Sequence, residues 1–258
     1  MRRVVCWFSC GVTSAVAAKL TLEDFPNEDV RVVYCDTRSE HPDNARFLRD
    51  CAEWFGRDIE IVGSRSFSDI WDVFVKTRWL VGPAGARCTT ELKKLVRRAY
   101  ELPGDLQVFG FDASEPGRAE RFRLNNLEVD LRTPLLLRGL SKADCADIVM
   151  RAGLEVPEMY RLGYRNANCV GCVKGGAGYW NKIRRDFPTV FWRMARLERE
   201  LGASIVRIQS SNGSRNRVFL DELPPTAGHY ASEPALECGL LCGVQEELFP
   251  KAAPVAPP

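Results

Sequence analysis

Short apolar runs alternate with helix-like segments through the first half of the chain. Four runs of apolar and β-branched residues predict buried strands: residues 2–8, 30–35, 59–62 and 106–111. Four segments between them place apolar residues at helical spacing: residues 12–22, 42–55, 67–76 and 91–100. Strands that alternate with helices in this way form βαβ units. The pattern therefore predicts an α/β fold, with a mainly parallel sheet flanked by helices.

The pattern changes after residue 140. Ser141 predicts the N-cap of a helix that Gly153 ends. Four further segments follow: an irregular stretch rich in Gly, Asn and Cys at 157–178, helices at 179–185 and 189–201 separated by Pro188, and a polar turn at 210–217. We expect three parts: an α/β domain at 1–140, a smaller helical and irregular part bearing cysteines at 141–250, and a disordered Ala/Pro-rich tail at 251–258.

The charge of the chain is nearly balanced. The 258 residues include 36 Lys and Arg and 34 Asp and Glu, for a formal net charge of +2. This balance argues neither for nor against a nucleic-acid partner. Lys182, Arg184 and Arg185 form one candidate basic patch, although a solvated helix face is the simpler explanation of these residues.

The sequence predicts a cytoplasmic protein with no membrane partner. No apolar run approaches the roughly 18 residues that a membrane-spanning helix needs. The basic start is followed only by Val4–Phe8, which is shorter than the ~7–15 residues of a signal-peptide core. The oligomeric state stays open, with a homodimer as one option.

Ten cysteines are many for such a chain. A reducing compartment disfavours a disulfide framework, so core, metal-binding and redox roles are the alternatives. Four of them lie in predicted strands or on helix faces and are expected in the core: Cys6, Cys35, Cys51 and Cys145. The others are candidates for chemistry.

The hexapeptide Ser9–Ser14 (SCGVTS) links the first predicted strand to the first helix. Backbone N–H groups at a helix N-terminus are unpaired, and the helix dipole favours negative charge there. Gly11 allows a phosphate to approach the backbone, and Ser9, Thr13 and Ser14 add hydroxyl groups. A simple capped turn between a strand and a helix would look the same, and the loop matches neither G-x-x-x-x-G-K-[ST] nor G-x-G-x-x-G.

This loop resembles the S-G-G-x-x-S loop of the PP-loop adenine-nucleotide hydrolases. Cys10 replaces one glycine, and Val12 stands where many ATP-using members carry lysine. A loop without that lysine is more similar to the phosphoadenosine phosphosulfate (PAPS) reductase branch. The order and spacing of the similar segments agree over roughly residues 4–120.

Three further segments support this resemblance. Residues 33–42 are similar to the Y-x-D-T-x-x-x-x-P segment of the branch, and residues 87–94 resemble its R-x-C-x-x-x-K element. Residues 110–118 stand where the family has G-x-R-x-x-[EQ]-S-x-x-R, but Asp112 replaces an arginine and the register of Arg118 slips. These departures weaken the expectation of phosphosulfate recognition.

The resemblance implies a Rossmann-like fold of the PP-loop (HUP) type that binds ATP, PAPS or adenosine phosphosulfate (APS) in residues 1–140. Asp36, at the end of the second strand, can accept a hydrogen bond from the ribose or the adenine. Lys93 and Arg118 can act in catalysis by neutralising phosphate or sulfate oxygens. The implied nucleotide-binding residues are Ser9, Cys10, Gly11, Val12, Thr13, Ser14, Asp36, Thr37, Arg87 and Gly110.

Cys169 and Cys172 form a C-x-x-C motif in a Gly-rich loop, where two thiolates can converge on one metal. Cys88, Cys238 and Cys242 are candidates for the other ligands. A zinc site often uses a second C-x-x-C pair or histidines, and the chain has only two histidines. This favours an iron–sulfur centre over zinc, over a redox C-x-x-C and over buried thiols.

Iron–sulfur members of the reductase branch, and the related DNA-phosphorothioation sulfur-transfer proteins, hold a [4Fe-4S] cluster. Residues 237–240 (ECGL) resemble the E-C-G-L-H tail of the reductases, whose cysteine is the nucleophile. The resemblance thus implies Cys238 as nucleophile, and cluster ligands Cys88, Cys169, Cys172 and a C-terminal cysteine, which we assign as Cys242. Cys242 could instead resolve a disulfide, and Cys238 could instead complete the cluster.

Three functions follow as hypotheses. The first is thiol-dependent reduction of PAPS or APS, with thioredoxin as partner. The second is ATP-dependent sulfur transfer, with a sulfur donor such as a cysteine desulfurase and an unknown acceptor. The third is a nucleotide- or nucleic-acid-binding module that holds zinc or a cluster without catalysis, which the near-neutral charge does not support.

Overall fold

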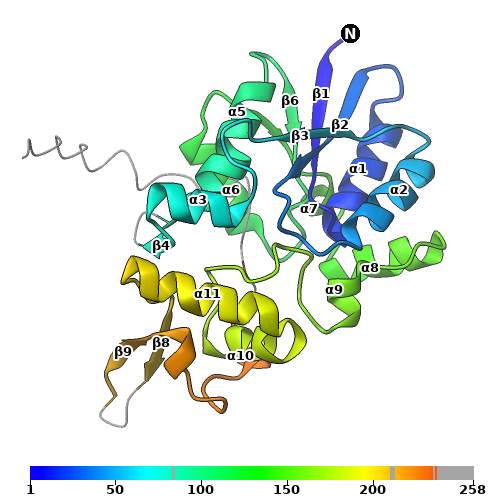
Figure 1. Ribbon diagram of the computed structural model, residues 1–258. Coiled ribbons are helices and arrows are strands. Elements are labelled where there is room, and N and C mark those ends of the chain that lie inside the picture. The colour runs from blue at the N-terminus through cyan, green and yellow to red at the C-terminus, as the bar shows by residue number, and fades with distance from the viewer. Residues whose placement is uncertain (83–84, 210–212, 235, 237–258) are drawn as a thin grey trace, which may run out of the picture.

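The computed structural model describes residues 1–82, 85–209, 213–234 and 236. Its centre is a five-stranded sheet in the order β3-β2-β1-β6-β7, in which every neighbouring pair is parallel (Figure 1). The strands are β1 (Arg3–Phe8), β2 (Asp29–Asp36), β3 (Glu60–Gly63), β6 (Leu106–Val108) and β7 (Asp130–Arg132). The predicted α/β class with a mainly parallel sheet is confirmed. The strand order reverses between β1 and β6, and ligands of such sheets bind beyond the carboxyl ends of the strands at that point.

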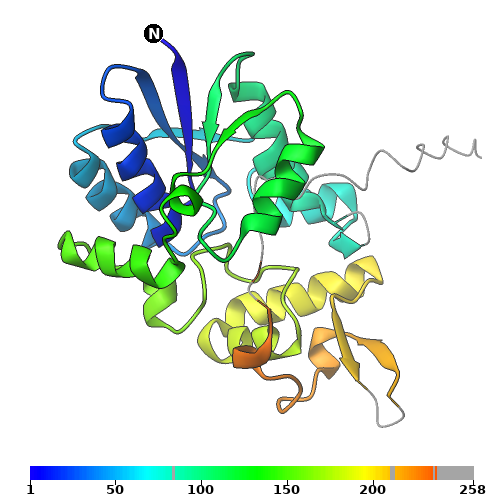
Figure 2. The same cartoon turned by 180° about the vertical axis from the view of Figure 1, so that it is seen from behind.

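Helices cover both faces of the sheet. Helices α1 (Val12–Asp24) and α2 (Asn44–Phe55) lie on one side, and α5 (Leu95–Tyr100) and α6 (Pro116–Asn125) lie on the other, as Figures 1 and 2 both show. Alternate residues of β1 enter two different hydrophobic clusters, one with α1 and α2 and the other with α5 and α6. Burial on both faces explains why the parallel strands appear in the sequence as continuous apolar runs.

The remaining elements of the described chain are short or belong to the second half. They are α3 (Ile70–Thr77), β4 (Val81–Gly82), β5 (Gly85–Ala86), α4 (Arg87–Thr89), a π-helical turn (Thr90–Lys94), α7 (Pro134–Leu137), α8 (Lys142–Arg151), α9 (Glu158–Arg161), α10 (Ala177–Asp186), α11 (Pro188–Leu201), β8 (Val206–Gln209), β9 (Arg215–Val218) and two 3₁₀ turns (Leu220–Glu222 and Tyr230–Ser232). None of the helices in the described part of the chain has the length and apolarity that a membrane crossing requires.

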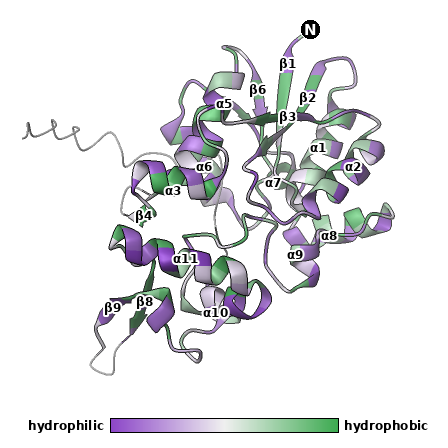
Figure 3. Ribbon diagram, in the orientation of Figure 1, coloured by the Kyte–Doolittle hydropathy of each residue, from purple (hydrophilic) through white to green (hydrophobic). Residues whose placement is uncertain are grey.

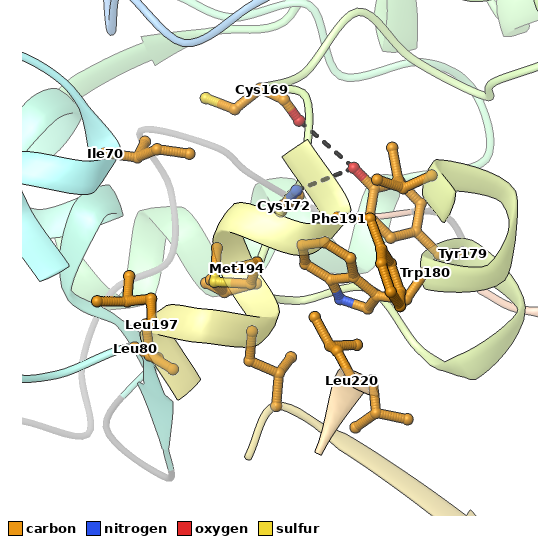
Figure 4. Close-up of a cluster of buried hydrophobic side chains, with 14 of the residues drawn as sticks. Ile70, Leu80, Cys169, Cys172, Tyr179, Trp180, Phe191, Met194, Leu197 and Leu220 are labelled. Carbon is orange, nitrogen blue, oxygen red and sulfur yellow. Dashed lines mark hydrogen bonds between the residues drawn. The ribbon is translucent and has the colours of Figure 1, made fainter. Parts of the chain in front are cut away.

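Helices α10 and α11 and the hairpin β8–β9 form a lobe beyond the carboxyl ends of the sheet (Figures 1 and 2). A third hydrophobic cluster fills this lobe and includes Trp180, Phe191 and Leu220 (Figure 4). Phe74 of α3 and Leu92 of the π-helical turn belong to the same cluster, so it joins the lobe to the first half of the chain. Helix α11 is amphipathic, with hydrophobic and hydrophilic residues on different sides (Figure 3).

The helix predicted to start at Ser141 is present as α8. The Ser141 side chain accepts a hydrogen bond from the Asp144 backbone N–H, and the Asp144 carboxylate accepts one from the Ser141 backbone N–H, which is a complete capping box. The two helices expected on either side of Pro188 are present as α10 and α11, and Pro188 is the first residue of α11, because a proline at the first helical position loses no helical hydrogen bond.

The expected polar turn at 210–217 is only partly correct, since residues 215–218 form β9, which pairs antiparallel with β8. Cys6, Cys51 and Cys145 are fully buried and Cys35 nearly so, which confirms the four cysteines expected in the core. The predicted tail at 251–258, Cys238 and Cys242 lie outside the described residues.

Candidate functional site

A cavity of about 330 Å³ lies at the carboxyl edge of the sheet. Its walls come from the end of β1 and the loop Ser9–Ser14, from the segment Phe109–Arg118 after β6, from Asn166–Asn168 and from Leu236. This volume falls at the lower end of the range of small-molecule sites, which is ~300–1,000 Å³. The cavity therefore occupies the place where the sheet topology predicts a ligand.

The Ser14 side chain organises the loop. Its hydroxyl donates to the Gly11 carbonyl oxygen at 2.9 Å and accepts from the backbone N–H groups of Ser9 at 3.1 Å and Gly11 at 3.3 Å. Ser9, Gly11, Thr13 and Ser14 all line the cavity. The loop is thus held in one conformation with small residues facing the cavity, as an anion-binding turn requires.

Cys10 and Val12 belong to the hydrophobic cluster between the sheet and α1. Cys10 has a φ of 54°, the left-handed region that favours glycine, at the position where the resembled motif has glycine. Its Sγ lies 3.8 Å from the Asn44 carbonyl oxygen, and burial raises the pKa of this thiol well above its usual value. Cys10 therefore fills the core and is not an ionised nucleophile.

Gly110 allows β6 to approach the loop. A Cβ atom built at this glycine would lie 2.9 Å from both Cα and N of Ser14, which is too close for any side chain. Tyr160 of α9 also contacts the loop. Its hydroxyl lies 3.2 Å from a Cβ built at Gly11, and it accepts a hydrogen bond from the backbone N–H of Val12. No sequence motif marks Tyr160, because α9 lies far along the chain from the loop.

Lys93 and Arg118, the two proposed catalytic cations, both line the cavity. The π-helical turn holds Lys93, whose Nζ lies 3.5 Å from Oε1 of Glu40, and the other Glu40 oxygen accepts from the Tyr34 hydroxyl at 2.8 Å. Both side chains of the Lys93–Glu40 pair are buried, so the pair is only weakly screened by solvent. The ion pair with Glu40 therefore holds the ammonium group of Lys93 at the cavity wall.

Arg118 forms an ion pair with Glu115 and lies over the ring of Phe111, with its guanidinium carbon 5.5 Å from the ring centroid. The chain at Asp112 forms a tight turn, in which one carboxylate oxygen accepts from the backbone N–H of Ser114 at 2.8 Å and from its hydroxyl at 2.5 Å. Only 5% of the surface of Asp112 is exposed, and this residue lines the cavity. The cavity therefore contains acids beside its cations.

Lys142 also lines the cavity, and sequence reasoning missed it. Burial lowers the pKa of its ammonium group. Its Nζ donates to the Arg165 carbonyl oxygen and lies 5.2 Å from the centroid of the Tyr160 ring. The first residue of an ordinary capped helix carries no sequence signal for such a role.

Among the described residues, the structure does not bring Asp36, Thr37 and Arg87 to the cavity wall. Asp36 accepts a hydrogen bond from the backbone N–H of Arg38 at 2.7 Å, and the half-exposed Arg87 pairs with Glu91 at 2.7 Å. The Thr37 hydroxyl lies 3.2 Å from Sγ of Cys169. Thr37 thus joins the segment after β2 to the C-x-x-C motif.

Tyr179 shapes the C-x-x-C loop (Figure 4). Its hydroxyl accepts from the backbone N–H groups of Gly171 at 3.1 Å and Cys172 at 2.9 Å and donates to the Cys169 carbonyl oxygen at 3.5 Å. Gly171 has a φ of 80°, which lets the chain turn between the two cysteines. Tyr179 thus holds the backbone of the turn through three hydrogen bonds.

Cys169 and Cys172 are buried, and Cys88 packs against the same hydrophobic cluster. Thiols in a dry loop are the donors that an iron–sulfur cluster uses. Within the described ranges, however, no three His, Cys, Asp or Glu side chains form a group that could hold a metal ion. The structure thus does not gather Cys88, Cys169 and Cys172 into one metal-holding group among the described residues, and the expected fourth ligand, Cys242, lies outside them.

Leu236 connects the cavity to the C-terminal segment. The side-chain amides of Asn166 and Asn168 donate to its carbonyl oxygen at 2.9 Å and 3.1 Å. All three residues line the cavity. The chain that leads to Cys238 is thus held at the cavity by the segment that leads to Cys169.

The fold is similar to that of several solved structures. A PAPS reductase from Candida auris in complex with phosphate is 16% identical, with a TM-score of 0.47, over 64% of this chain and 81% of that one. The U34-tRNA thiolase NcsA from Methanococcus maripaludis with its [4Fe-4S] cluster is 16% identical, with a TM-score of 0.44, over 85% of this chain and 80% of that one. An NH3-dependent NAD synthetase from Campylobacter jejuni in complex with nitrate is 14% identical, with a TM-score of 0.40, over 78% of this chain and 85% of that one.

No family model matches the chain, and no curated protein matches it. Identities and TM-scores this low carry no functional argument, so we base the function on the residues of this chain.

Proposed function

We propose that this chain is an enzyme that binds an adenine nucleotide in the cavity and carries out sulfur chemistry with the thiol of Cys238. One observation carries the proposal: Leu236, two residues before Cys238, lines the same cavity as the loop Ser9–Ser14. This position of Leu236 supports a single site shared by the proposed phosphate loop and the proposed nucleophile.

The phosphates of the nucleotide would lie against the N-terminus of α1. The N–H groups there and the hydroxyls of Ser9 and Thr13 can donate to phosphate oxygens. Lys93 and Arg118 stand at the same wall and can stabilise charge on a departing phosphate. Their carboxylate partners, Glu40 and Glu115, hold both cations in place before the ligand arrives.

The first form of the chemistry is reduction of an adenylyl sulfate. The Cys238 thiolate attacks the sulfate sulfur, a sulfur–sulfur bond forms, and the bond from sulfur to the phosphate oxygen breaks, which releases the nucleotide. A thiol of thioredoxin, or Cys242, then attacks the Cys238 sulfur and releases sulfite as a disulfide forms. The two thiols supply the two electrons that reduce the sulfate group to sulfite, and they end as a disulfide.

The second form is ATP-dependent sulfur transfer, and Asp112 favours it. A buried carboxylate at the cavity wall opposes a further anionic group, such as a sulfate or a 3′-phosphate. In this form an acceptor oxygen attacks the α-phosphate of ATP and pyrophosphate leaves. The outer sulfur of a persulfide on a donor protein, such as a cysteine desulfurase, then attacks the adenylated centre of the acceptor and AMP leaves. A thiol such as Cys238 breaks the remaining sulfur–sulfur bond by attacking the donor's cysteine sulfur, so that a disulfide forms and supplies the two electrons.

We further propose that Cys88, Cys169, Cys172 and Cys242 hold a [4Fe-4S] cluster, with zinc as the alternative. The support is the hydrophobic cluster that includes Cys169 and Cys172 and against which Cys88 packs, together with the contact between the Thr37 hydroxyl and Sγ of Cys169. Such a cluster would supply an electron-rich centre that holds sulfur near the nucleotide. Iron, sulfide and zinc assays on anaerobically purified protein test it: about four irons and four sulfides per chain support it, and one zinc without iron contradicts it.

The test of function is a comparison of nucleotides in a turnover assay. The protein is incubated with PAPS or APS plus a reduced dithiol, and with ATP plus a sulfide source. Sulfite release marks the first chemistry, and AMP and pyrophosphate mark the second. Cys238→Ser should abolish sulfite release, whereas Cys145→Ser, a buried core control, should leave it intact. Equal product from both variants and the wild type would contradict the role of Cys238.

A further inference from the structure

The hairpin β8–β9 presents one polar face and one apolar face. Val206 belongs to the hydrophobic cluster of the lobe, and Ile208 packs against it. The residues that alternate with them along the strand therefore point outward. The register pairs Arg207 with Arg217 and Gln209 with Arg215 across the two strands. The outward face, defined as Arg207, Gln209, Arg215 and Arg217, is therefore exposed and carries three guanidinium groups.

Two like charges directly opposite each other on an antiparallel pair are destabilising. Arg207 and Arg217 are such a pair, and the sequence from 201 to 220 contains no Asp or Glu to offset them. Within the described ranges, no ion pair involves any of the three arginines; Arg217 donates to the Ser204 carbonyl oxygen. The face thus concentrates positive charge at a cost to the isolated protein.

The nearest acids in the sequence are engaged elsewhere. Asp221 and Glu222 pair with Arg199 at 2.9 Å and 2.6 Å. Glu198 is fully buried and accepts the backbone N–H groups of Ile205 and Leu220. These carboxylates therefore do not serve the outward face, and an external anion is the missing partner.

We propose that the outward face of the β8–β9 hairpin binds the phosphate backbone of a nucleic acid. Guanidinium groups recognise phosphates through paired hydrogen bonds, and residues two apart on a strand lie ~7 Å apart. Three guanidiniums spread over two strands suit a polymer of phosphates better than a single small anion.

A nucleic acid fits the face better than an anionic membrane. Proteins that lie on membranes combine cations with apolar side chains that enter the lipid. The four outward positions contain no apolar residue, and the apolar residues of the hairpin pack inward. The surface is also independent of the cavity chemistry, so this proposal does not rest on the proposed function.

The test measures anisotropy of fluorescent duplex DNA, single-stranded DNA and an RNA hairpin with the full chain, at several salt concentrations. The triple variant Arg207→Ala, Arg215→Ala and Arg217→Ala should bind at least ~10-fold more weakly, and the slope of log affinity against log salt should fall by about 2–3. The matched control removes the same charge from three exposed helical sites, Arg49, Arg121 and Arg151, and should bind within about twofold of the wild type.

A triple replacement of the same arginines by lysine guards against a folding defect, because it keeps the charge and should keep most of the salt dependence. The proposal is overturned if the alanine variant binds as tightly as the control variant, or if the wild type binds none of the three nucleic acids. Binding only to vesicles with anionic lipids, included as a separate arm, also overturns it. The nucleic acid bound most tightly identifies the source of the phosphates.

Discussion

The side-chain amide of Asn168 donates a hydrogen bond of 3.1 Å to the carbonyl oxygen of Leu236. This contact joins the residue before Cys169 to a residue two positions before Cys238. Asn166 donates to the same oxygen at 2.9 Å. The two cysteine segments that the sequence singles out are therefore linked through one carbonyl group at the cavity.

Loss of this link should lower turnover more than it lowers nucleotide affinity. In the double variant Asn166→Ala and Asn168→Ala, the C-terminal segment loses its anchor while the loop Ser9–Ser14 stays intact. We expect kcat to fall about tenfold, since two hydrogen bonds of ~1 kcal/mol each hold the segment. Asn181→Ala, which also removes amide donors to two carbonyl oxygens but outside the cavity, should leave kcat unchanged. A drop confined to nucleotide affinity would contradict the anchor role.

Ser14→Ala should weaken nucleotide binding by about tenfold. The hydroxyl makes hydrogen bonds to Ser9 and Gly11 that fix the loop, and each contributes ~1 kcal/mol. Calorimetric titration measures the change. Thr21→Val, which removes another buried hydroxyl from the same helix, is the control and should bind the nucleotide normally. Equal affinity of the two variants would remove Ser14 from the binding account.

Gly110→Ala should both destabilise the protein and impair nucleotide binding. The added Cβ would lie 2.9 Å from the Ser14 backbone, so α1 must move away from β6. Overpacking of this kind costs about 1–3 kcal/mol. Gly117→Ala, in α6, meets no atom within 4 Å and should be neutral or slightly stabilising. Chemical denaturation of the two variants, followed by nucleotide titration, checks the contrast; matching stabilities would argue against close contact at Gly110.

Glu198 should make stability depend on pH. Burial raises the pKa of its carboxyl to about 7, so between pH ~5 and ~7 the folded chain holds a proton that the unfolded chain has lost. Stability from this group therefore falls as pH rises through that window, by up to about 3 kcal/mol. Glu198→Gln should show a flatter dependence in urea unfolding at pH 5, 6 and 7. The exposed neighbour Glu200→Gln should keep the wild-type slope, and an unchanged slope in Glu198→Gln would refute the assignment.

The central sheet could be predicted because its strands are buried on both faces. Runs such as Val4–Phe8 and Val30–Cys35 are continuous and apolar, and they appear as β1 and β2. Strand β7, with the sequence Asp-Leu-Arg, is too short and too polar for such a signal. Residues 210–217 predict a polar turn, and strand β9 is missed because its outward positions carry arginine.

The site was predictable only where its residues follow one another in a motif. The cavity wall includes Ser9, Gly11, Gly110, Lys93 and Arg118, all from segments that the sequence marks as motifs. Tyr160, Lys142 and the two asparagines reach it through tertiary contacts from short or irregular segments, which no local pattern marks. The position of Thr37 against Cys169 arises in the same way, from two segments more than a hundred residues apart.

The most direct test of the account is an equilibrium titration of the wild-type chain with ATP, APS and PAPS, with GTP as the control nucleotide. The account predicts saturable binding of at least one adenine nucleotide at one site per chain, tighter than GTP and weakened by Ser14→Ala. No saturable binding, or equal binding of GTP, would contradict an adenine-nucleotide site in the cavity.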